Sequence, residues 1–175
     1  MENKVSITIP ENMANLLFYG QNTTVELNAS RYHDWNDEFQ YSKFPYELLF
    51  YSNIDAYRPW LYDEIIPRIF KEWEVIKSRL EGFFSERKKD QSKELMVQGI
   101  AQCLCAMFWQ NQQPVELKDW ESVSESFTYK PVNWQERMNF IMTRPNLYHS
   151  FIQLSELMEE LKKIYYKQQV LKKRK

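Results

Sequence analysis

Two histidines and two cysteines are the side chains of this chain best suited to metal or nucleophilic chemistry. His33 lies beside Asp34, Asp37 and Glu38, and these residue types can ligate a metal ion. One histidine with neighbouring acids in a polar loop is a weak metal pattern, because no second set of ligands follows at helical spacing. The stretch is therefore interpreted as a solvated acidic loop, and no metal site is predicted.

The remaining candidates for chemistry are isolated from one another. Cys103 and Cys105 are two residues apart, which on a helix separates their directions by about 200°. They can then form neither a disulfide nor a shared metal site, and we interpret them as small buried hydrophobic residues. His149 is expected in the first turn of a helix, with a local hydrogen bond. With only three glycines, the chain has no phosphate-binding loop, and no nucleophile elbow or zinc-protease motif occurs. We expect no enzyme activity and no cofactor.

Arginines among aromatic residues and prolines are stronger candidates for binding. Arg58 lies in the sequence Tyr-Arg-Pro-Trp that ends at Trp60, and Arg137 and Arg144 also have aromatic or proline neighbours. Arginine stacks on aromatic rings and forms bidentate pairs with carboxylates. These side chains either clamp helix ends and bridge to glutamates, or line a pocket for an anion or an acidic peptide.

The charge of the chain is divided between its body and its C-terminus. Residues 162–175 hold seven Lys or Arg and no acid, so residues 1–161 have a net charge of −8. Such a tail could bind nucleic acid, anionic lipid or an acidic partner. It would also complement the negative end of a helix macrodipole and aid solubility. The proposed contacts at its end are Lys172, Lys173, Arg174 and Lys175.

Trp109 is a further candidate for this interaction surface. It precedes the polar residues 110–113 and is expected to be exposed there. Tryptophan is enriched at binding hot spots, although a Trp in such a position more often caps the core.

Helices must position these groups, and the spacing of apolar residues predicts where the helices lie. Apolar residues recur at steps of three and four in most of the chain after Phe44. In 92–110 they cover nearly the whole circumference, which is typical of a central, buried helix. Gly99 in this segment predicts a close helix crossing. Helices are predicted at 45–51, 66–87, 92–110, 117–127 and 134–144, and from 145–148 toward the C-terminus.

Several residues predict where these helices begin. Pro45 and Pro67 suit the first helical turn, where a missing N–H costs nothing. Asn133 is predicted to cap the helix that starts at Trp134, with Glu136 returning a bond to the cap.

The first forty-three residues are less regular. Val5, Ile7 and Ile9 alternate with polar residues, which predicts a short extended segment. No partner strand is evident, so we expect an arm that lies on the body. Aromatic residues should anchor the following loop: Trp35, Phe39 and Tyr41.

Composition supports an all-α fold in one domain. A chain of 175 residues is long enough to bury a core without disulfides or metal, and scarce glycine argues against a sheet-rich fold. We expect five or six helices in 44–175 and the arm in 1–43. No signal peptide or membrane span is predicted, so a cytoplasmic protein is expected.

Three phrases resemble the YpoC-like proteins of Gram-positive bacteria. They are FPYELLFYSNIDAYRPW (Phe44–Trp60), CAMFWQNQQPV (Cys105–Val115) and KPVNWQERMNFIMTRPNLYHSFIQLSELMEELKK (Lys130–Lys163). The resemblance implies a small helical protein of the cytosol without an assigned function, and it carries over no catalytic residue. Our functional expectation is a non-catalytic module that binds an unknown protein partner. The alternative is an accessory protein that contacts nucleic acid through the basic tail.

Overall fold

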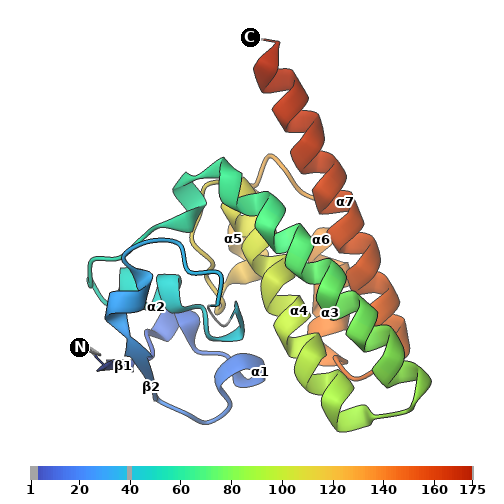
Figure 1. Cartoon of the computed structure of the whole chain (residues 1–175), viewed down its shortest axis with the longest axis horizontal. Helices are drawn as coiled ribbons and strands as arrows, with labels where there is room; N and C mark the ends of the chain where they lie inside the picture. Colours follow the sequence, from blue (N-terminus) through green and yellow to red (C-terminus); the bar gives the residue numbers. More distant parts are fainter. Residues whose placement is uncertain (1–3, 39–40, 175) are drawn as a thin grey trace.

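Helices make up most of this protein, as the composition predicts. The computed structural model describes residues 4–38 and 41–174. In that part of the chain, seven α-helices and one pair of strands are joined by loops and short 3₁₀ turns (Figure 1). The strands are β1 (Lys4–Thr8) and β2 (Thr24–Asn28). The helices are α1 (Leu16–Tyr19), α2 (Pro45–Tyr51), α3 (Ile66–Ser85), α4 (Lys89–Gln110), α5 (Trp120–Glu125), α6 (Trp134–Thr143) and α7 (Tyr148–Lys173).

The expected fold class is confirmed, since the protein is predominantly α-helical with one small sheet. Between residues 44 and 174 the structure has six α-helices, α2 to α7, which agrees with the five or six expected there. The additional helix, α1, lies in the N-terminal segment, and its four residues are too few to produce a periodic pattern. None of the described helices is both long and apolar enough to cross a bilayer.

The long helices α3, α4 and α7 pack against one another, and α4 contacts both of the others. Every residue of α4 from Gly99 to Gln110 is buried, as the apolar pattern predicts. A Cβ atom on Gly99 would lie 2.8 Å from Cζ3 of Trp73 in α3 and 3.2 Å from Cδ2 of Leu154 in α7. The missing side chain thus permits the close approach of three helices, and the predicted crossing is confirmed.

The N-terminal segment differs from the expected arm. β1 pairs antiparallel with β2, and Val5 faces Leu27 across the pair while Ile7 faces Val25. The expectation of a strand without a partner was therefore wrong. The second strand also alternates apolar and polar residues, but over only five residues, and the buried side of each strand becomes clear only once the hairpin lies on the helices.

The loop after β2 is anchored to the body by aromatic side chains. Tyr41 is buried, and the Trp35 ring stacks on Tyr46 of α2 with 5.7 Å between the ring centres. Phe39, also expected to be an anchor, lies outside the described residues.

Proline marks helix starts as predicted, whereas the predicted asparagine cap does not form. Pro45 and Pro67 lie in the first turns of α2 and α3. α6 begins at Trp134, but Asn133 has a φ of 57° and its side chain makes no capping bond. A left-handed residue aims its side chain away from the first-turn amides. Asn133 contributes instead by tolerating this conformation, which few residue types adopt.

Candidate functional site

The arginines proposed for a common pocket each have a separate partner. The Arg58 guanidinium lies 4.9 Å from the centre of the Phe50 ring, and that of Arg144 lies 4.9 Å from the Phe140 ring. Trp60 is buried and packs edge-to-face on the same Phe50. A surface pocket of about 420 Å³ is lined by Arg58 but not by Arg137 or Arg144. The geometry does not bring the set together, so an anion site formed by all of them stays a prediction without structural support.

Arg137 joins α6 to α7. Its guanidinium donates to both carboxylate oxygens of Glu160, at 2.8 and 3.0 Å, and to the carbonyl of Val132 at 3.1 Å. The hydrogen bond with Glu160 raises the pKa of Arg137 further above its already high value. Planar bidentate pairing of this kind holds two elements in a defined orientation. Arg137 thus matches the alternative interpretation, in which the arginines bridge to glutamates.

Trp109 does not belong to the protein surface, and this expectation was wrong. Its side chain is 1% exposed, because the last two turns of α4 remain covered by the segments that precede and follow the helix. Nε1 of Trp109 donates to Oε2 of Glu47, 2.8 Å away in α2. The backbone N–H of Val115 donates to the same oxygen at 3.1 Å. Trp109 therefore closes the core, the other role considered for it.

Glu47 is the one buried acid among the described residues, and sequence reasoning missed it. The available signal was a single charge within the aromatic run FPYELLFY. Burial raises the pKa of Glu47 to about 7, although the donors Trp109 and Val115 act in the opposite direction. Its Oε1 has no hydrogen-bond partner in the described structure. Because its side chain has no exposed surface, dissolved substrate cannot reach the carboxyl group, and its role here is in packing and stability.

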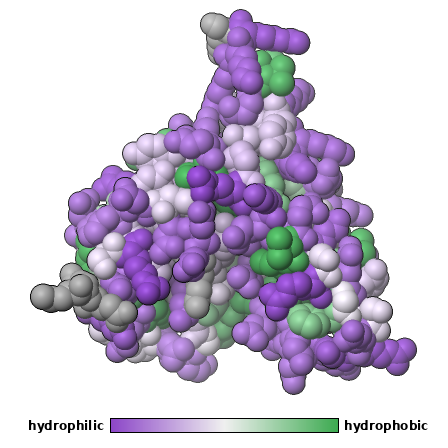
Figure 2. Space-filling view, in the orientation of Figure 1, coloured by the Kyte–Doolittle hydropathy of each residue, from purple (hydrophilic) through white to green (hydrophobic). Residues whose placement is uncertain are grey.

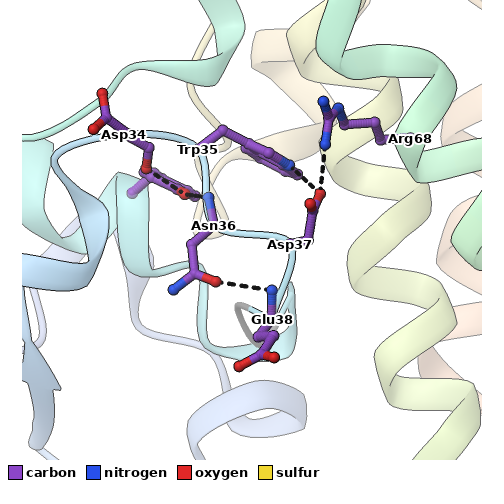
Figure 3. A network of polar contacts seen from close by, with 7 residues as sticks. Asp34, Trp35, Asn36, Asp37, Glu38 and Arg68 are labelled. Carbon is purple, nitrogen blue, oxygen red and sulfur yellow. Dashed lines mark hydrogen bonds and ion pairs between the residues drawn. The ribbon is translucent and has the colours of Figure 1, made fainter.

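The acidic loop around His33 is held by bonds within the protein (Figure 3). Asp37 accepts hydrogen bonds from Nε1 of Trp35 at 2.6 Å and from Arg68 of α3 at 2.7 Å. These two donors lower the pKa of Asp37. The neighbouring Asn36 accepts from the backbone N–H of Glu38 at 2.9 Å. These bonds order the loop and connect it to α3.

The other candidates for chemistry, the two cysteines and His149, pack against neighbouring parts of the protein. Cys103 and Cys105 are buried, and burial raises the pKa of both thiols. The ring of His149 packs on Phe140 and lies 3.0 Å from the Gln153 side-chain nitrogen. In the part of the chain that the structure describes, no cluster of three or more potential metal ligands occurs.

The last turns of α7 project beyond the rest of the molecule (Figure 1). Two contacts join this helix to the segment just before α3: Lys172 pairs with Asp63, and the Tyr165 hydroxyl donates to the Asp63 carbonyl at 3.1 Å. The predicted contact residues Lys173 and Arg174 are exposed. Lys175 lies outside the described residues. The described part of the tail therefore forms the predicted cationic helix end. One of its cations, Lys172, is already paired with a carboxylate.

Apolar side chains lie between the cations of this helix end. Tyr166, Val170 and Leu171 are 47%, 50% and 50% exposed. A hydrophobic patch interrupts the hydrophilic surface near the tip (Figure 2). Since consecutive helical residues point about 100° apart, Tyr166 and Val170 share one face while Leu171 lies on another. Exposed apolar side chains therefore lie on two faces of this cationic helix end.

A groove runs between α7 and the loop that follows α5; we call it the α7 groove. Its polar part, of about 310 Å³, is lined by residues that include Gln110 and Lys172. Its apolar part, of about 320 Å³, is lined by residues that include Ile164 and Leu171. Both parts are lined by Thr128, Tyr129 and Gln168, so they adjoin each other. Sequence reasoning missed this groove, because its walls come from separate segments.

Comparison with known proteins agrees with the predicted resemblance. The model of the family described as YpoC-like protein matches residues 63–173. A protein of Bacillus subtilis (strain 168), named Uncharacterized protein YpoC, is 41% identical over 103 residues, which are 58% of this chain and 63% of that protein. The chain therefore covers less than two thirds of this relative. No solved structure matches the chain.

The family match covers α3 to α7 and includes the projecting helix end. Of the phrases that carried the resemblance, Phe44–Trp60 precedes the matched region, whereas the other two lie within it. The match extends over more than half of the chain, and the chain belongs to the YpoC-like family.

Proposed function

We propose that this protein is a non-catalytic interaction module that docks an acidic segment of a partner protein on the projecting end of α7, residues 163–174. The observation that carries the proposal is the combination of unpaired cations and exposed apolar side chains on this end. Lys163, Lys167 and Lys173 are exposed and form no ion pair within the described residues. An acidic amphipathic segment would neutralise these charges and cover the apolar side chains between them.

The helix macrodipole explains only part of this charge. Its effect falls off within the last turn of a helix, so it accounts for Lys172 and Lys173 but not for Lys163 or Lys167. Solubility alone would also not require exposed Val170 and Leu171 among the lysines. A docking surface accounts for both features.

The absence of catalysis is part of the proposal. The side chains that could take part in a reaction are either buried or paired within the protein. Glu47 and the two cysteines are buried, and Arg137 is held by Glu160. The exposed groups at the end of α7 are lysines and apolar side chains, which suit recognition better than proton transfer.

The proposal can be tested with peptides selected on the full-length protein. From a phage-displayed library of random peptides, we expect enrichment of sequences that combine Asp or Glu with apolar residues. The double substitution of Lys163 and Lys167 by Glu should weaken these peptides by about tenfold or more in calorimetry. The matched control replaces Lys89 and Lys93, which are also exposed and four residues apart on a helix. If no acidic peptide is enriched, or if both double variants bind equally, the proposal is wrong.

Nucleic-acid binding through the tail is the second candidate, and the run of bases without an acid in residues 162–174 favours it. Fluorescence anisotropy with a labelled DNA duplex and a labelled RNA at low salt distinguishes the two. If the tail contacts phosphates, the double lysine variant should reduce the slope of log K against log salt by about 0.9 for each lost duplex contact. The absence of binding at low salt would exclude this candidate.

A further inference from the structure

The α7 groove offers a more specific site on the same helix end. It lies on the flank of α7 that carries Ile164 and Leu171, whereas Val170 lies outside its lining. The inference below rests on the proposed function, because it names the part of the helix end that receives the partner and the form that the partner takes there.

The lining of the polar part includes a buried glutamine. Gln110, the last residue of α4, is 5% exposed and donates through Nε2 to the carbonyl of Leu161 at 3.2 Å. Its Oε1 has no hydrogen-bond partner in the described structure. A buried acceptor without a partner costs free energy unless a ligand or water supplies a donor. Because this oxygen has almost no exposed surface, a molecule in the groove cannot reach it, and the groove is defined by its charge and its apolar lining.

One wall of the groove is held in place. The Asn111 side chain donates to the carbonyl of Tyr129 at 2.8 Å and accepts from its backbone N–H at 3.0 Å. These two hydrogen bonds pair the Asn111 side-chain amide with the Tyr129 backbone. The backbone N–H and carbonyl of Tyr129 therefore both have hydrogen-bond partners. Tyr129 is left to present its side chain to the groove, where it is partly exposed.

The apolar part of the groove suits a different kind of ligand group. Ile164 and Leu171 lie two helical turns apart on α7 and, with Tyr129, form an apolar lining. Lys167 lies between them in the chain and forms no ion pair within the described residues. The carboxylate that lines the neighbouring polar part, Asp63, is already paired with Lys172. The free charge of the groove is therefore positive, and its ligand should carry a carboxylate.

We propose that the α7 groove holds an extended acidic segment of a partner protein, which places an apolar side chain against Ile164 and Leu171 and a carboxylate near Lys167. An extended segment suits the site because its successive side chains point in opposite directions. One stretch of chain can thus direct one side chain into the apolar part and the next toward Lys167.

Two adjacent residues provide a matched test. Val170 and Leu171 are each 50% exposed on the same helix, but only Leu171 lines the groove. With acidic peptides selected on the full-length protein as probes, Leu171→Glu should weaken binding by about tenfold to a hundredfold. Val170→Glu introduces the same charge outside the groove; because Val170 belongs to the wider docking surface, it should weaken binding as well, but less than Leu171→Glu does. Both substitutions lie on exposed positions, and circular dichroism melts verify that both variants remain folded.

A second measurement reports on occupancy of the groove, because Gln110 lines its polar part. In nitrogen-15 spectra of the full-length protein, the Gln110 side-chain amide signals should shift when peptide is added. Those of Gln98, earlier on the same helix and outside the groove lining, should not. Unchanged Gln110 signals in a bound complex would place the peptide outside the groove and overturn the inference.

The outcomes separate this inference from the proposed function. Loss of binding in Val170→Glu but not in Leu171→Glu would overturn the groove and leave docking on α7 intact. If neither substitution nor the double lysine variant weakens the peptides, both proposals are wrong. Dimerisation of the free protein that Leu171→Glu abolishes would instead make a second copy the occupant and overturn the inference.

Discussion

Replacing Glu47 with Gln should make the stability of this protein less dependent on pH. Gln has nearly the same size as Glu, and its Oε1 can accept the bonds that Trp109 and Val115 now donate to Glu47. The Gln amide nitrogen would take the place of the carboxylate oxygen that has no partner. The substitution therefore removes the charge with little change in packing.

The magnitude follows from the difference between the folded and unfolded pKa of Glu47. Burial raises the folded value to about 7, from 4.5 for an ordinary glutamate. Between these values the unfolded chain releases a proton that the folded protein retains, so stability falls as pH rises, by about 1.4 kcal/mol per pH unit. Below the lower value both states are protonated, and the cost is absent. Above the higher value both are ionised, and the full cost of about 3 kcal/mol is reached.

The assay is urea unfolding of the native protein and the Glu47→Gln variant near pH 5 and near pH 8. The gain in the free energy of unfolding from the substitution should be larger near pH 8 by about 2 to 3 kcal/mol. The matched control is Glu74→Gln, the same change on an exposed position of α3. Equal gains from Glu47→Gln at the two pH values would refute the reasoning. They would mean that the pKa of Glu47 is the same in the folded and unfolded protein, so that its ionisation does not change stability with pH.

Other predictions concern the packing of the long helices. Gly99→Ala should lower the free energy of unfolding by about 1 to 3 kcal/mol, because the new methyl group meets Trp73. Gly82 has open space around it, so Gly82→Ala should raise the free energy of unfolding by about 0.5 to 1 kcal/mol. Equal effects of the two in thermal melts would contradict the close crossing. Arg137→Met removes the bidentate bonds to Glu160 and should destabilise the protein by about 1 to 2 kcal/mol, measured by urea unfolding. An unchanged midpoint would mean that this partly exposed pair contributes nothing.

The regular elements of this fold could be predicted from local patterns. The three-and-four spacing in α3, the apolar circumference of α4 and the prolines at helix starts each belong to one segment, and each prediction was confirmed. Gly99 also predicted the helix crossing, because a small residue in a buried helix has few other reasons to be there. The cationic end of α7 was equally evident, since charge counts need no knowledge of neighbours.

The groups that make the candidate site were not predictable in this way. Gln110, Tyr129 and Leu171 come from three separate segments, and no periodicity within one segment states which other segment it will contact. The same reason explains Trp109, whose polar neighbours in sequence indicated exposure although α2 supplies Glu47 to its ring nitrogen. Sequence by itself determined which elements form and where the charge accumulates, because propensity, periodicity and charge are local properties. Tertiary structure alone decided which arginines are paired, which tryptophan is covered and where a groove remains, because these depend on contacts between residues far apart in the chain.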